Sequence, residues 1–171
     1  MKIIGIDPGY AIVGYGVVDY TSNRFTTLDY GAIITEAGTP FEQRLLTIYE
    51  DLTAILERHH PDALSVEKLF FTNNQKTAIA VAEARGVILL AATRAGVPVY
   101  EYTPLQVKQA VVGYGRAEKN QVIDMVKRIL NLKAVPKPDD AADAVAIALC
   151  HARSHTSLIA GKTGGSVCST I

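Results

Sequence analysis

Apolar residues in this chain occur either in short continuous runs or in longer stretches with helical spacing. The short runs predict five strands, at residues 2–7, 12–19, 25–34, 62–67 and 97–102. Stretches with apolar positions three and four residues apart predict five helices, at residues 40–59, 75–95, 104–112, 117–131 and from 139 or 140 to about 154. Because three strands come first and helices then alternate with strands, we expect an α/β fold, a mixed five-stranded sheet with helices on both faces.

Turn and breaker residues mark the boundaries of these elements. Residues 21–23, Thr-Ser-Asn, predict a tight hairpin, so the second and third strands should be antiparallel. Pro40 favours the first turn of a helix and Pro61 ends that helix. Gly96 and Pro98 end the helix at 75–95 in the same way.

Length and composition indicate one globular domain. The chain has 171 residues, of which 49% are hydrophobic and 20% are charged, and this usage argues against disorder. We expect the folded domain at residues 1–155 and a flexible, Gly- and Ser-rich tail at 156–171. The sequence contains neither a secretory signal pattern nor an apolar run of membrane-spanning length, so we expect a cytoplasmic protein.

The formal net charge is zero, but the charges are unevenly distributed. Residues 103–138 contain seven basic and two acidic side chains, a net charge of +5, so the remainder carries −5. One interpretation is a basic face that binds nucleic acid, and the other is an ordinary solvated helix surface. Charge alone does not decide between them.

Four carboxylates occupy positions where a charge is costly. Asp7 and Glu67 each end an apolar strand, and Asp140 and Asp143 open an otherwise apolar helix. Ligand sites in open α/β sheets lie beyond the carboxyl ends of the strands, and residues at i and i+3 share one helix face. Because Mg²⁺ prefers carboxylate oxygens together with water and phosphate, the pattern predicts a divalent-metal site for phosphodiester hydrolysis.

Each carboxylate also has a structural interpretation. Asp7 in the Asp-Pro-Gly sequence is a typical turn residue. Asp140 and Asp143 are suited to capping a helix and to complementing its dipole, and Glu67 has a possible ion-pair partner in Lys68. Together, however, four unrelated coincidences at one edge of a sheet are less plausible than a single site.

Several short motifs occur in the order seen in a known family. They are Gly-Ile-Asp-Pro-Gly at 5–9, Glu67 after the fourth strand, Ala-Arg-Gly at 84–86, Val-Lys-Gln at 107–109, Ala-Glu-Lys at 117–119 and Asp-Ala-Ala-Asp-Ala at 140–144. In these motifs the chain resembles the RuvC family of bacterial Holliday junction resolvases, over roughly residues 1–155. Asp139 lies outside the motif, and we assign it to the start of the helix.

The resemblance implies a ribonuclease H-like fold and a homodimer that resolves four-way DNA junctions in recombination and repair by paired symmetric nicks. It implies two Mg²⁺ ions per active site, with Mn²⁺ as a possible substitute, and Asp7, Glu67, Asp140 and Asp143 as catalytic metal ligands. A branch-migration complex of the RuvA and RuvB type is an implied partner. The dimer contact is implied to lie on the helix at 75–95, which is apolar on nearly every side.

DNA contacts are predicted around this site. Lys108, Arg116 and Lys119 are candidates to hold phosphates. Of the two aromatic residues after Glu67, the resemblance favours Phe70 to stack on an unpaired base. Asn73 and Lys76 are weaker candidates in the same segment.

Two alternative functions remain. Actin-like ATPases and sugar kinases also place Asp-Pro-Gly after a first strand, but those phosphotransferases need a hydroxyl residue soon afterwards, where Tyr10 and Ala11 stand. A non-catalytic junction-binding module is the second alternative, although it does not require four acids. His151 and His155, four residues apart without a third ligand, predict a surface or capping role rather than a zinc site.

Overall fold

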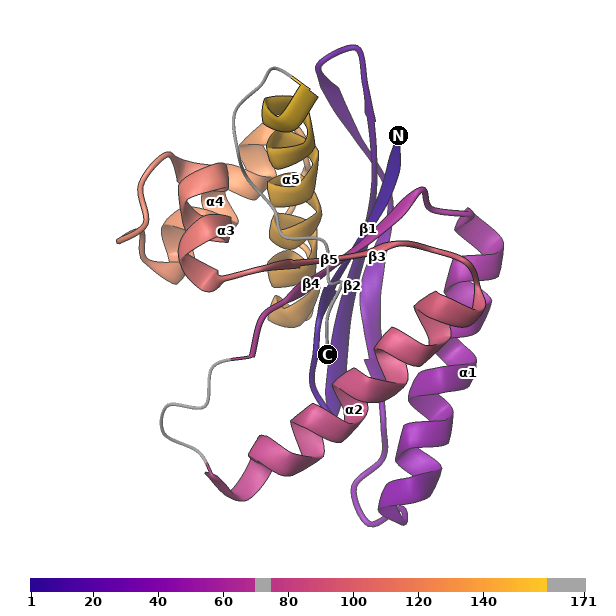
Figure 1. The fold of residues 1–171 in the computed structure, drawn as a ribbon. Coiled ribbons are helices and arrows are strands. Elements are labelled where there is room, and N and C mark those ends of the chain that lie inside the picture. The colour runs from indigo at the N-terminus through magenta and orange to yellow at the C-terminus, as the bar shows by residue number, and fades with distance from the viewer. Residues whose placement is uncertain (70–74, 160–171) are drawn as a thin grey trace.

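One five-stranded sheet carries helices on both of its faces (Figure 1). The computed structural model describes residues 1–69 and 75–159 and, within the helices, the side chains of all but residues 75, 76 and 156–159. The strands are β1 (Lys2–Asp7), β2 (Ile12–Thr21), β3 (Arg24–Ile34), β4 (Ala63–Glu67) and β5 (Val99–Tyr102). The helices are α1 (Phe41–His59), α2 (Gln75–Arg94), α3 (Pro104–Val112), α4 (Lys119–Ile129) and α5 (Asp139–Ile159).

The strand order is β3-β2-β1-β4-β5, and the sheet is mixed as predicted. β1 pairs antiparallel with β2, and β2 with β3, whereas β1–β4 and β4–β5 are parallel. Ser22 and Asn23 form the β2–β3 turn with positive φ angles of 52° and 61°. Two consecutive positive φ angles match the right-handed twist of a hairpin, so this short connection forces antiparallel pairing.

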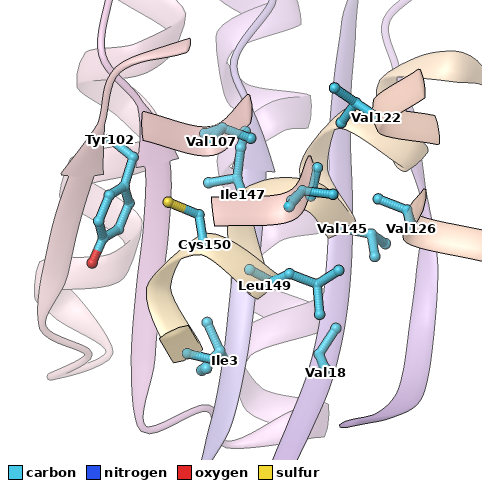
Figure 2. Close-up of a cluster of buried hydrophobic side chains, with 14 of the residues drawn as sticks. Ile3, Val18, Tyr102, Val107, Val122, Val126, Val145, Ile147, Leu149 and Cys150 are labelled. Atoms are coloured by element: carbon cyan, nitrogen blue, oxygen red, sulfur yellow. The ribbon is translucent and has the colours of Figure 1, made fainter. Parts of the chain in front are cut away.

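The alternation of side chains along β1 divides the interior into two cores. Ile4 and Ile6 point toward α1 and α2, where they pack with Ile48 and Ile88. Ile3 points to the opposite face, toward α3, α4 and α5 (Figures 1 and 2). Because successive strand residues face opposite sides, Gly5 and Asp7 lie on the α5 side with Ile3. The position of Asp7 on this side of the sheet therefore follows from its register in β1.

Glycines let α5 approach the sheet closely. Gly5 and Gly16 are directly paired across β1 and β2. A Cβ atom at Gly5 would collide with the carbonyl oxygen of Ala144, and one at Gly16 would collide with Val145. At these two glycines helix α5 therefore approaches the strand backbone directly, with no strand side chain between them.

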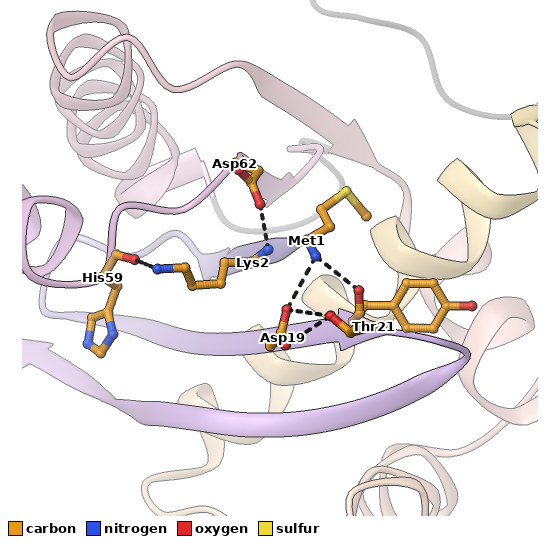
Figure 3. Close-up of polar contacts among 7 residues, drawn as sticks. Met1, Lys2, Asp19, Thr21, His59 and Asp62 are labelled. Atoms are coloured by element: carbon orange, nitrogen blue, oxygen red, sulfur yellow. Dashed lines mark hydrogen bonds and ion pairs between the residues drawn. The ribbon is translucent and has the colours of Figure 1, made fainter.

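Polar contacts hold the amino-terminal end of β1 (Figure 3). The Lys2 backbone N–H donates to the Asp62 carboxylate at 2.7 Å, and the Lys2 ammonium group donates to the His59 carbonyl oxygen at 2.7 Å. The Met1 ammonium group donates to Asp19 at 3.3 Å. These bonds tie β1 to the end of α1, the start of β4 and the adjacent strand β2, at the end of β1 away from Asp7.

Helix α5 differs from its prediction at one end. It begins at Asp139, within the predicted range, but continues to Ile159 rather than ending near 154. Residues 156–159, expected to belong to the flexible tail, are therefore helical. The next residue that disfavours a helix is Gly161, so nothing in the local sequence ends α5 at 154.

The close packing of α5 generates a prediction. Gly5→Ala should lower the free energy of unfolding by about 1–3 kcal/mol, because the added methyl group displaces α5 from the sheet. Chemical denaturation monitored by circular dichroism measures this change. Gly86→Ala, within α2, is the matched control, because its Cβ meets no atom of the chain within 4 Å and should not destabilise the fold. Equal stability of the two variants would contradict the prediction.

Candidate active site

Asp7 and Glu67 lie at the carboxyl ends of neighbouring parallel strands. β1 and β4 pair with Gly5 opposite Ser65 and Ile6 opposite Val66, so the next residues along each strand are Asp7 and Glu67. Both side chains belong to the sheet face that α5 covers, because Ser65 and Glu67 alternate with Leu64 and Val66 of the other core. The convergence expected from a parallel β1–β4 pair is present.

The first turn of α5 brings Asp140 and Asp143 to the same edge. Gly14 of β2 is the direct cross-strand partner of Asp7. A Cβ atom at Gly14 would collide with the backbone carbonyl oxygen of Asp140, so the start of α5 rests on the residue paired with Asp7. This contact between Gly14 and Asp140 sets the helix start beside the catalytic candidate on β1.

A pocket of about 190 Å³ lies at this edge. Its walls contain three of the four predicted carboxylates and two of the predicted DNA-binding lysines. The lining residues are Asp7, Glu67, Pro104, Val107, Lys108, Lys119, Val122, Asp143, Ala146 and Ile147. Asp140 is not among the lining residues, and it acts on the site through its charge. Arg116 does not line the pocket and is exposed in the segment between α3 and α4.

The carboxylates perturb one another electrostatically. Burial raises the pKa of Asp7 to about 7, and the negative charges of Glu67, Asp143 and Asp140 contribute in that order. The pKa of Glu67 is also raised, first by burial and then by Asp143. A carboxylate whose pKa is raised by other carboxylates lies in a concentration of negative charge that favours a cation.

Lys119 supplies one positive charge to this cluster. Its Nζ atom lies 2.8 Å from Oδ2 of Asp143, and this hydrogen bond is the main reason that the pKa of Lys119 is raised. The charge of Lys119 in turn lowers the pKa of Asp7 and of Glu67. Its contact with a carboxylate 24 residues away depends on the packing of α4 beside α5, which local sequence patterns do not reveal.

The donor chemistry suits a hard divalent cation. All four candidates are carboxylates, the ligand type that Mg²⁺ prefers. Among residues 1–69 and 75–159, no three His, Cys, Asp or Glu side chains lie close enough together to enclose a metal ion. Three of the four carboxylates, Asp7, Glu67 and Asp143, instead line the pocket. Mg²⁺ keeps several waters and is commonly bound by one or two carboxylates together with substrate phosphate.

Three predicted DNA contacts cannot be placed. Phe70 and Asn73 lie outside the described residues. Lys76 belongs to the first turn of α2, but its side chain is also outside the description. Their roles stay predictions from the resemblance.

The prediction for His151 is wrong. Its side chain is buried rather than on the surface, and Nδ1 shares a 2.8 Å hydrogen bond with the Tyr102 hydroxyl group. Burial, followed by the charge of His155, lowers the pKa of His151 to about 4. The i, i+4 spacing of the two histidines could not reveal this, because it does not show that α5 is surrounded by the sheet, α3 and α4.

The sheet order, together with acids at the ends of β1 and β4 and at the start of the last helix, defines a ribonuclease H-like nuclease. The chain belongs to the RuvC family: the family described as "Crossover junction endodeoxyribonuclease RuvC" matches residues 3–151. The resemblance seen in the sequence motifs is thereby confirmed.

Proteins of the same description are similar over most of their length. The chain is 59% identical to the crossover junction endodeoxyribonuclease RuvC of Ruminiclostridium cellulolyticum, over 91% of this chain and 93% of that protein. It is 60% identical to the protein of that description from Brevibacillus brevis, over 90% of this chain and 92% of that protein.

Solved structures agree with this assignment. Thermus thermophilus RuvC superposes with a TM-score of 0.86 and 39% identity, covering 97% of this chain and 100% of that chain. The T. thermophilus RuvC structure in complex with a Holliday junction substrate gives a TM-score of 0.84 at 39% identity, covering 92% of this chain and 96% of that chain. The yeast mitochondrial resolvase Ydc2, at 14% identity and a TM-score of 0.68, shares the fold. In the described part of the chain, no helix combines the length and apolarity needed to cross a membrane.

The raised pKa of Asp7 predicts a pH-dependent stability in metal-free protein. The folded state should resist ionisation of Asp7, so this residue's contribution to stability falls as the pH rises from about 4 to about 7. In a chelating buffer at pH 8, the free energy of unfolding of the Asp7→Asn variant should be about 1–3 kcal/mol higher than that of the parent, allowing for solvent screening.

Urea denaturation between pH 4 and pH 8 measures this gain, which should disappear near pH 4. Asp139→Asn is the control, because a hydrogen bond from Lys137 lowers the pKa of Asp139 and its removal should not stabilise the protein. No gain for Asp7→Asn at pH 8 would contradict the electrostatic account.

Proposed function

We propose that this chain resolves four-way DNA junctions by Mg²⁺-dependent hydrolysis of phosphodiester bonds, in DNA recombination and repair. The observation that carries the proposal is the convergence of Asp7, Glu67 and Asp143 on one pocket that also contains Lys108 and Lys119. Membership of the RuvC family and the likeness to RuvC in complex with a Holliday junction substrate support the choice of substrate.

The four carboxylates Asp7, Glu67, Asp140 and Asp143 would hold two Mg²⁺ ions, with Mn²⁺ as a substitute. When bound, such a metal pair supplies Lewis acidity at the scissile phosphate and offsets its negative charge. The family resemblance implies products with a 5′ phosphate and a 3′ hydroxyl group, so each nick can be sealed by a ligase.

The lysines and the apolar wall would position the DNA strand. Lys108 and Lys119 line the pocket from α3 and α4, where their charges suit the phosphates beside the cleaved bond. Pro104, Val107 and Ile147 form apolar parts of the wall and limit the entry of bulk water. Arg116, exposed between α3 and α4, would contact phosphates farther along the strand.

The competing functions have less support. A junction-binding module without catalysis does not need a buried Asp7, whose pKa burial and neighbouring carboxylates raise, in a pocket that must receive phosphate. A phosphotransferase of the actin-like or sugar-kinase type needs a hydroxyl residue after the Asp-Pro-Gly turn, and this chain has Tyr10 and Ala11 there.

We also propose a homodimer with its contact on α2. Ile79 and Leu90 on this helix are 71% and 55% exposed, whereas Ala84 and Ile88 are buried against the sheet. The helix therefore has a second apolar face beyond the one that its own core uses. A two-fold dimer would present two identical sites to the two strands of a symmetric junction. Family membership further supports a cytoplasmic location and cooperation with a branch-migration complex of the RuvA and RuvB type.

Substitutions at the start of α5 test the metal site. Asp140→Asn and Asp143→Asn should fold and bind a synthetic four-way junction, but cut it at least about a hundredfold more slowly in Mg²⁺. Asn keeps the shape and the capping ability of Asp but lacks the anionic oxygen that the metal needs. Asp139→Asn should cut nearly as fast as the parent, since Asp139 pairs with Lys137 at 2.8 Å outside the pocket.

Single-turnover cleavage of the junction, compared with linear duplex of the same sequence, is the measurement. If Asp139 is essential and Asp140 is not, the assignment on the helix is wrong by one residue. If all three variants cut at the parent's rate, these residues act only at the helix start, and the metal-site proposal fails.

The dimer proposal has a separate test. Combining Ile79→Glu with Leu90→Glu should convert a dimer into a folded monomer, because two charges would be buried at the contact. Sedimentation velocity at micromolar concentration measures the assembly, and far-ultraviolet circular dichroism checks the fold. Ile34→Glu, at a 64% exposed position on β3, is the matched control and should remain dimeric. A monomeric parent would refute the proposal.

A further inference from the structure

Two exposed apolar side chains lie on and just after α3, the helix that contributes Pro104, Val107 and Lys108 to the candidate active site. Leu105, in the first turn of α3, is 59% exposed, and Tyr114, just after α3, is 48% exposed. Large apolar side chains exposed to water are informative when they gather next to a functional pocket. Leu105 and Tyr114 are called the apolar pair below.

The segment after α3 turns back toward the start of the helix. Gly113 ends the helix with φ of +99°, and its N–H donates to the carbonyl oxygen of Gln109 at 2.9 Å. The chain then turns back, so that a Cβ atom at Gly115 would collide with Cδ1 of Leu105. Tyr114 is therefore held between two glycines, one of which contacts Leu105 directly.

Leu105 belongs to the part of α3 that forms the pocket wall. Pro104, Val107 and Lys108, all within three residues of Leu105, line the pocket that contains Asp7 and Glu67. Tyr114 follows the end of α3 and precedes Gly115, which contacts Leu105, and both side chains of the pair are exposed rather than buried.

The surroundings of the pair favour a nucleic-acid strand as its occupant. Residues 103–138 carry a net charge of +5, and Lys108, Arg116 and Lys119 follow Leu105 along the chain. A second copy of the chain is a less suitable occupant, because the exposed apolar face of α2 lies on the opposite side of the sheet (Figure 1). A DNA strand provides both phosphates for the basic residues and flat apolar bases and sugars for the pair.

We propose that Leu105 and Tyr114 pack against a base or sugar of the nucleotides next to the cleaved phosphate and so position the strand in the pocket. This inference rests on the proposed function. Both are positioning residues, because they act on the geometry of the strand and not on the reacting atoms. Tyrosine suits the task, since its ring offers an apolar face while its hydroxyl group stays in water.

The experiment uses full-length Tyr114→Ala, Leu105→Ala and Tyr114→Phe variants with a four-way junction. A 2-aminopurine base beside the cleavage site reports stacking by its fluorescence, in buffer without divalent metal. Single-turnover cleavage in Mg²⁺ is measured with saturating enzyme. Leu46→Ala, at a 45% exposed position on α1, is the matched control.

Tyr114→Ala should lose the fluorescence change and cut at least about fivefold more slowly, the effect of losing one base-stacking contact. Leu105→Ala should show the same losses to a smaller degree. Tyr114→Phe and Leu46→Ala should resemble the parent, and all four variants should keep the parent's melting temperature because the substituted side chains are exposed.

A parent-like fluorescence response and cleavage rate for Tyr114→Ala would overturn the inference. So would a loss of cleavage that follows a fall in melting temperature without any change in the fluorescence response. If the parent binds the junction but does not cut it, the proposed catalysis fails. The fluorescence comparison then still decides whether Tyr114 contacts the strand.

Discussion

The close contact between α5 and the β1–β2 pair is the constraint on which the site depends. At Gly5, Gly14 and Gly16 no strand side chain separates the strands from α5, so the helix contacts the backbone of the sheet there. Because Gly14 is the cross-strand partner of Asp7, the same contact that packs the helix also sets the distance from Asp7 to Asp140. A change in the packing of α5 at this position would therefore also change the geometry of the site. A backbone contact of this kind tolerates little adjustment, since interiors are packed as densely as organic crystals.

The site combines this rigidity with unfavourable electrostatics. Burial and neighbouring carboxylates raise the pKa of Asp7, and Lys119 offsets only part of that charge through its hydrogen bond with Asp143. Favourable interactions elsewhere in the fold must offset the free-energy cost of this charge. They include the burial of large side chains on both faces of the sheet. They also include the hydrogen bonds that tie Lys2 to His59 and Asp62 at the other end of β1. The unfavourable negative charge is thus concentrated at the edge where a divalent cation would offset it.

The two faces of the sheet have different surfaces. On one side α2 exposes Ile79 and Leu90, which suit a second copy of the chain. On the other side α3 and α4 contribute Lys108 and Lys119 to the pocket, and the apolar pair is exposed on α3 and just after it. The surface proposed for a DNA strand and the surface proposed for a partner subunit are therefore different. In the proposed dimer, this separation would leave both sites free to engage one junction.

The sequence by itself determined the strands and helices, the mixed sheet and the family, because these depend on periodicity, turn residues and short motifs. It also predicted the four carboxylates as site residues. Only the tertiary structure decided which distant residues meet. Three contacts join residues that are 24 or more positions apart: Lys119 with Asp143, Asp140 with Gly14, and His151 with Tyr102. A periodic pattern shows which side of an element is apolar, but not which element covers that side. For this reason the spacing of the two histidines predicts a surface or capping role for His151, whereas the residue belongs to the core.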